Sequence, residues 1–111
     1  MTWFYSPQID EVLSAGTSMS SMHVNNWSLD RHAAILAIQS LKGMGIAILG
    51  GDVIVRANQA LHHTYDSWYC DPIDGESSEA YINRSASTAV NYIEAYPKGD
   101  YLFAIVPEVK S

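Results

Sequence analysis

Two β-rich stretches of similar length, separated by a short polar break, constrain the fold of this sequence more than any other feature. The first is GIAILGGDVIVRA (45–57), the second is ALHHTYDSWYC (60–70), and the polar residues of ANQA separate them. This arrangement predicts an antiparallel hairpin with its turn near Asn58. Gly50 and Gly51 then form a bulge or bend inside the first arm. Because Gly-Gly is itself a two-residue hairpin loop, a turn at the glycines is the alternative.

Three other stretches have the period and end signals of helices. Residues 6–16 begin with a Ser-Pro cap and stop at a glycine, and residues 78–97 end at a proline. Residues 28–43 have the strongest helix signals, with Ser28 as the expected N-cap and Ile35 among the polar residues of the helix. The apolar positions expected to be buried are Ile9, Val12, Leu13, Leu29, Ala33, Leu36, Ala37, Ile38, Leu41, Ile82, Ala86, Ala89, Val90 and Ile93.

The remaining segments complete an α+β domain. Residues 17–26 and 71–78 are small and polar and are expected to be loops, and 101–106 is apolar on both faces, which is typical of an interior strand. The predicted order is α-α-β-β-α-β in one domain over 1–111. We expect a small antiparallel or mixed sheet with a hairpin near residues 46–70 and helices packed on it.

The charge balance excludes several classes of partner. Twelve Asp and Glu against six Lys and Arg give a net charge of −6. Nucleic acid and anionic membranes both need basic surface, so neither is an expected partner. Cys70 is the single cysteine, which rules out an internal disulfide. The first ten residues lack the pattern of a signal peptide, and a cytoplasmic protein is expected.

The Gly-Gly-Asp stretch does not predict an enzyme. A phosphate-binding loop needs Lys and Ser/Thr after its glycines, whereas Asp52 and an apolar strand follow here. The Gly-Gly-Asp signature of diguanylate cyclases continues with Glu-Phe in a longer domain. A nucleophile elbow is also missing, and a lone Cys70 is more often a small hydrophobic residue. We expect no catalytic residues.

Several side chains near the second arm have the chemistry of metal ligands. His62 and His63 are adjacent, so on a strand they point to opposite faces, and His62 to Asp66 spans about 13 Å. A site would need further ligands such as His23 or His32. We therefore expect no metal and no cofactor. The candidates considered are His62, His63, Asp66, Cys70 and Asp71.

An acidic segment with aromatic neighbours is the strongest binding signal. It carries five carboxylates, and no Lys or Arg lies between Arg56 and Arg84. Large aromatics beside charge are typical of an interface with a basic partner. The alternative is a solvated acidic loop whose aromatics face the core, and composition alone favours it. The predicted partner-binding residues are Tyr65, Asp66, Trp68, Tyr69, Asp71, Asp74, Glu76 and Glu79.

Several ordered stretches resemble one protein family. They are NNWSL before the long helix, AILGGDV, YDSWY, and the S…A…YI pattern of the last helix with its following strand. Together they cover most of residues 25–106, and they resemble the immunity protein 40 family of bacterial polymorphic-toxin and contact-dependent growth inhibition systems. Trp27, Asp52 and Trp68 fall on the family's motif positions.

The resemblance implies a protein that binds the toxic C-terminal domain of a cognate toxin and covers its active site. Many toxins of such systems are nucleases. The motif residues Trp27, Gly50, Gly51 and Asp52 are then structural: the glycines allow close backbone approach, and Asp52 accepts nearby backbone N–H bonds. The alternative function is a small non-enzymatic ligand-binding or regulatory module with a pocket beside the hairpin.

Overall fold

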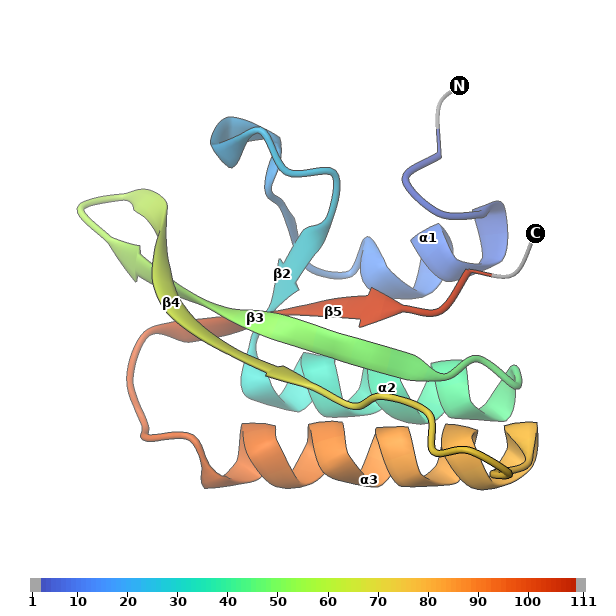
Figure 1. The fold of residues 1–111 in the computed structure, drawn as a ribbon. Coiled ribbons are helices and arrows are strands. Elements are labelled where there is room, and N and C mark those ends of the chain that lie inside the picture. Colours follow the sequence, from blue (N-terminus) through green and yellow to red (C-terminus); the bar gives the residue numbers. More distant parts are fainter. Residues whose placement is uncertain (1–2, 110–111) are drawn as a thin grey trace.

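A five-stranded antiparallel sheet with the strand order β1-β2-β5-β3-β4 is the frame of the molecule (Figure 1). The structure is a computed structural model that describes residues 3–109. The strands are β1 (Thr17–Ser18), β2 (Trp27–Leu29), β3 (Ile48–Ala57), β4 (Ala60–Tyr69) and β5 (Tyr101–Pro107). The helices are α1 (Pro7–Leu13), the 3₁₀ turn η1 (Ser20–Met22), α2 (Arg31–Gly43) and α3 (Ser78–Ala95). The predicted α+β class is confirmed.

The predicted hairpin is β3 and β4, and its turn lies where the polar break predicted it. Ala57 pairs with Ala60, and the two residues between them, Asn58 and Gln59, have φ of 53° and 62°. Two successive left-handed residues are the signature of a type I′ turn, whose twist matches that of the strands. The alternative turn at the two glycines is wrong.

Gly50 and Gly51 lie inside β3, in regular register with β4 and β5 on either side. The register against β5 shifts just before Gly50, which places the irregularity at Leu49. Neither glycine has a positive φ. A Cβ on Gly50 would lie 2.3 Å from the Trp68 carbonyl oxygen, and one on Gly51 would lie 2.2 Å from Trp68 Cη2. Close approach of the neighbouring strand therefore requires glycine here.

The start of α2 differs from the prediction. Ser28 is not the cap but a buried residue of β2, paired with Ala104 of β5. Asp30 caps the helix, because its carboxylate accepts from the Ala33 amide at 2.8 Å. A strand of three residues is too short to show a period of its own. β2 pairs with β5 and so supplies hydrogen-bond partners to the backbone groups at that edge of β5. The helix α2 starts after β2.

The buried side of α2 also differs from the prediction. Leu36, expected in the core, is 55 % exposed, whereas Ile35, expected among polar residues, packs against the core. The buried residues are Ala34, Ala37, Ile38 and Leu41. At 100° per residue they centre the buried arc almost opposite Leu36. By contrast, the predicted stripe on α3 faces the core: Ala86, Ala89 and Ile93 are buried, and Ile82 and Val90 are partly buried.

Two clusters cover the two faces of the sheet. α2 and α3 run side by side beneath it and bury the main core, in which Phe103 and Ile105 of β5 are fully covered (Figure 1). The segment 17–26, expected to be a loop, contains β1 and η1. Its Met19 packs with Ile54 and Leu102 in a second, smaller cluster. β5 is thus an interior strand, as predicted.

Candidate functional site

The predicted acidic segment lies along β4, the last strand of the sheet, in the loop from β4 to α3, and in the first turn of α3 (Figure 1). Within residues 3–109, β4 pairs with β3 alone, so its outer side is open to a partner. Tyr65 and Tyr69 are 89 % and 76 % exposed. We name the exposed members of the predicted set the acidic edge; they are Tyr65, Asp66, Tyr69, Asp71, Asp74 and Glu79.

A bulge in the middle of β4 carries Tyr65. The pairing with β3 shifts between Asp52 and Ile54, where β4 holds two extra residues. The Thr64 hydroxyl fixes the bulge, since it donates to a β3 carbonyl at 2.9 Å and accepts from the Asp66 amide at 3.0 Å. Tyr65 has a φ of 69°, which few residues other than glycine adopt. The bulge therefore holds an exposed aromatic side chain in a defined place.

Asp66 is tied to the C-terminal end of α3. Its carboxylate accepts a hydrogen bond from the Tyr96 hydroxyl at 2.6 Å. Burial and this hydrogen bond raise the pKa of Tyr96 to about 12. The Tyr96 ring in turn packs edge-on against Tyr101 and Phe103. Asp66 thus anchors β4 to the helix as well as adding charge to the acidic edge.

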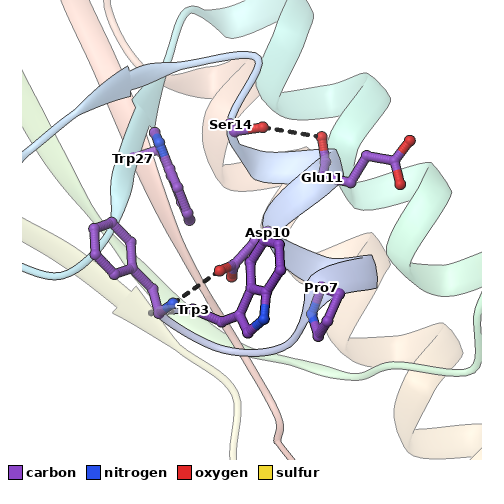
Figure 2. A pocket seen from close by; sticks show the side chains of 7 residues that line it. Trp3, Pro7, Asp10, Glu11, Ser14 and Trp27 are labelled. Carbon is purple, nitrogen blue, oxygen red and sulfur yellow. Dashed lines mark hydrogen bonds between the residues drawn. The ribbon is translucent and has the colours of Figure 1, made fainter. Parts of the chain in front are cut away.

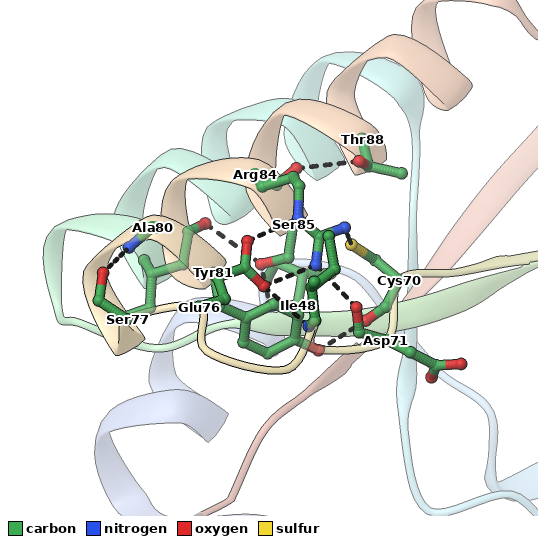
Figure 3. Close-up of polar contacts among 12 residues, drawn as sticks. Ile48, Cys70, Asp71, Glu76, Ser77, Ala80, Tyr81, Arg84, Ser85 and Thr88 are labelled. Atoms are coloured by element: carbon green, nitrogen blue, oxygen red, sulfur yellow. Dashed lines mark hydrogen bonds and ion pairs between the residues drawn. The ribbon is translucent and has the colours of Figure 1, made fainter.

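Arg84 of α3 organises the loop that carries the other carboxylates (Figure 3). Its guanidinium donates to both oxygens of Glu76 at 2.8 Å. It also donates to the Asp71 carbonyl at 2.7 Å and to the Cys70 sulfur at 2.9 Å. The same Glu76 carboxylate accepts from the Ile73 amide at 3.1 Å. An arginine of the helix that follows the segment therefore places a positive charge beside its carboxylates.

Because Glu76 pairs with Arg84, its negative charge is compensated within the protein and is not available to a partner. The pairing lowers the pKa of Glu76 to about 2, mainly through the hydrogen bonds from the guanidinium. Asp71, Asp74 and Glu79 are exposed, and no cationic side chain in residues 3–109 pairs with them. These three carboxylates are the part of the prediction that is free to meet a partner.

Trp68 lies in the core rather than on the acidic edge. It is 7 % exposed, and its indole stacks on Tyr92 of α3 at 4.9 Å between ring centroids. The same indole covers Gly51 on the paired strand. Trp68 therefore packs the hairpin onto α3. This agrees with the alternative prediction for the segment, in which its aromatic side chains face the core.

The other motif residues also have structural surroundings. Trp27 is half-buried and packs against Phe4, with 4.4 Å between ring centroids. Asp52 is exposed on the sheet, and its carboxylate accepts no hydrogen bond from residues 3–109. The expectation that Asp52 binds nearby backbone amides is therefore wrong for this part of the chain, because its side chain points away from the strand's own hydrogen bonds.

The histidines and Cys70 do not assemble. His62 and His63 pair with successive residues of β3 and so face opposite sides of the sheet, while Cys70 is buried against Arg84. In the described chain, no three His, Cys, Asp or Glu side chains lie close enough together to hold a metal ion.

A groove lined by aromatic side chains lies at the N-terminal segment (Figure 2). This aromatic groove has a volume of about 490 Å³. Trp3 and Phe4 come from the segment before α1, and Trp27 comes from β2. Sequence reasoning missed it, although the aromatic run Trp3-Phe4-Tyr5 was the available signal. The lining residues are Trp3, Phe4, Pro7, Asp10, Glu11, Ser14 and Trp27.

The fold and these surfaces define a small α+β protein with an exposed acidic strand edge and a groove. The family model described as Immunity protein 40 matches residues 18–107, and the chain belongs to that family. Membership supports an immunity role with a toxin as partner, and such proteins are generally not enzymes. No curated protein and no solved structure matches the chain significantly. None of the helices in residues 3–109 is long and apolar enough to cross a membrane.

Proposed function

We propose that this chain binds the toxic C-terminal domain of a cognate bacterial toxin and neutralises it by covering the toxin's active site with the acidic edge. One observation carries the proposal: in a member of an immunity family, Tyr65 and Tyr69 are exposed on an open strand edge, and the segment that follows this strand carries exposed carboxylates with no cationic partner in residues 3–109. Tyrosine supplies contact area and hydrogen bonds at interfaces, while the carboxylates select a basic partner.

A nuclease is the toxin class that this surface fits best. A nuclease must bind phosphates, so its substrate groove is basic. Carboxylates presented to that groove compete with the nucleic acid and steer association electrostatically. The proposal places the protein in the bacterial cytoplasm, as part of a polymorphic-toxin or contact-dependent growth inhibition system.

The test replaces Asp71→Asn, Asp74→Asn and Glu79→Gln together and leaves Glu76 in place, because Glu76 holds the loop to Arg84. Association with a cognate toxin domain is expected to slow about tenfold at low salt, with little change in dissociation. Glu94→Gln with Asp100→Asn is the control, since it removes exposed carboxylates outside the acidic edge. An unchanged association rate across a salt series contradicts the proposal.

The aromatic groove favours a second candidate, a ligand-binding or regulatory module. Its volume of about 490 Å³ lies in the range of small-molecule sites. It is built around α1 and β2, not beside the hairpin as the sequence suggested for such a pocket. A toxin gene immediately upstream would separate the two candidates, because a ligand-binding module has no need of one.

A further inference from the structure

Three aromatic side chains, Trp3, Phe4 and Trp27, line the aromatic groove, and Figure 2 shows Trp3 and Trp27 among the lining residues. Trp3 is 46 % exposed, and Phe4 and Trp27 pack together with an angle of 42° between their rings. An indole face attracts cations through its quadrupole, more strongly than the other aromatic side chains do. The walls therefore offer more than apolar contact.

The polar groups of the groove are acidic or neutral. Asp10 is 4 % exposed, and its two carboxylate oxygens accept from the amides of Phe4 and Tyr5 at 2.8 and 3.0 Å. This clamp fixes the segment that carries Trp3. Glu11 is exposed, and no lysine or arginine lines the groove. No cation within residues 3–109 pairs with either carboxylate.

We propose that the groove is a socket for an arginine side chain of the toxin. The partner's identity rests on the proposed function, whereas the arginine rests on the groove itself. A planar guanidinium stacks on indole faces, and its charge complements Asp10 and Glu11. An aliphatic side chain would fill the same walls but would leave the charges of Asp10 and Glu11 uncompensated.

The position of the groove in the chain suits recognition of one particular toxin. Six of its seven lining residues precede residue 18, where the match to the family begins. Only Trp27 belongs to the matched region. A contact made by residues that precede the family match is suited to distinguishing one partner from another.

The socket is tested without the toxin, by titrating Nα-acetyl-arginine amide against the full chain and observing the indole N–H signals by NMR. The signals of Trp3 and Trp27 are expected to shift, and that of the buried Trp68 is the internal reference. Nα-acetyl-citrulline amide is the control ligand, because citrulline has arginine's shape without its charge. Equal binding of the two ligands, or no shift with either, overturns the proposal.

Two variants locate the binding. Trp3→Leu keeps an apolar wall without the indole face and is expected to weaken arginine binding about two- to fivefold. Glu11→Gln removes the exposed charge and is expected to have an effect of similar size. Glu94→Gln, an exposed carboxylate outside both the groove and the acidic edge, is the matched control and leaves the affinity unchanged. If Glu94→Gln weakens binding as much as Glu11→Gln does, the ligand responds to net charge and the socket is disproved. These outcomes are independent of whether the acidic edge binds a toxin.

Discussion

At the scale of single residues, the contact between Gly51 and Trp68 connects the family motif to the fold. A Cβ on Gly51 would lie 2.2 Å from Trp68 Cη2 and 2.4 Å from the Ala104 carbonyl oxygen. The backbone of Gly51 has no positive φ, so the constraint is space and not conformation. Gly51 is thus required because an indole from the next strand lies on it.

Replacing Gly51→Val is expected to lower the free energy of unfolding by about 1–3 kcal/mol, because Trp68 must move out of its stack with Tyr92. The midpoint of urea unfolding measures this loss. Gly43→Ala is the control, since a Cβ on Gly43 at the end of α2 would meet nothing within 4 Å. Equal midpoints for Gly51→Val and the unchanged chain would show that the hairpin accommodates a side chain there.

At the scale of elements, the ion pair between Glu76 and Arg84 joins the loop after β4 to α3. The pKa of Glu76 is lowered from 4.5 to about 2 in the folded protein. A lowered pKa contributes stability that is fully present above pH 4.5 and is lost as the pH falls toward 2. The loop is therefore expected to loosen from the helix in acid.

Glu76→Gln tests this contribution. The variant is expected to be less stable than the unchanged chain near neutral pH, and the difference is expected to shrink as the pH falls from about 4.5 to 2. Urea unfolding at a series of pH values measures it. Asp74→Asn removes a neighbouring carboxylate with no pairing to Arg84 and serves as the control. A pH-independent difference between Glu76→Gln and the unchanged chain would rule out the ion pair as its source.

Local signals in the sequence predicted most of these elements but not the contacts between them. The caps at Ser6 and Pro7, the stripe on α3 and the turn at Asn58 all depend on neighbouring residues, and the structure confirms them. β2 was missed because three residues show no period. The pairing of Glu76 with Arg84 was missed because it is set by the packing of the loop on α3, not by any local pattern.

The candidate site was predicted in the same uneven way. Composition indicated the acidic segment, and the structure places its tyrosines and three free carboxylates on the surface. Composition could not predict that Trp68 is buried and Tyr69 exposed. Neighbouring residues of a strand point to opposite faces of the sheet, and the sequence did not show which face of β4 packs against the core. The aromatic groove joins the segment before α1 to β2, so it needed the fold to become visible.

At the scale of the whole molecule, the N-terminal segment belongs to the fold although the family match begins at residue 18. Ile9 and Leu13 of α1 are 4 % and 0 % exposed and pack with Leu41 of α2. The same helix holds Asp10, which fixes the wall of the aromatic groove. The acidic edge and the groove are therefore carried by one packed body, on β4 and beside β2 respectively.

Two surfaces on one body predict separable effects on toxin binding. β2 and β4 are separated by two strands, and the two surfaces share no residue, so their effects on binding are expected to add. The acidic edge acts at long range, so Asp71→Asn with Asp74→Asn and Glu79→Gln should slow association.

The groove acts only after contact, so Trp3→Leu should speed dissociation, by about two- to fivefold, and leave association unchanged. In the combined variant, the association rate is expected to fall as much as in the triple variant and the dissociation rate to rise as much as in Trp3→Leu. Surface plasmon resonance at low and high salt measures both rates. If the combined variant binds the toxin as tightly as the triple variant does, the groove does not contact the toxin. If Trp3→Leu changes only the association rate, Trp3 lies outside the contact, which contradicts its role as a socket wall.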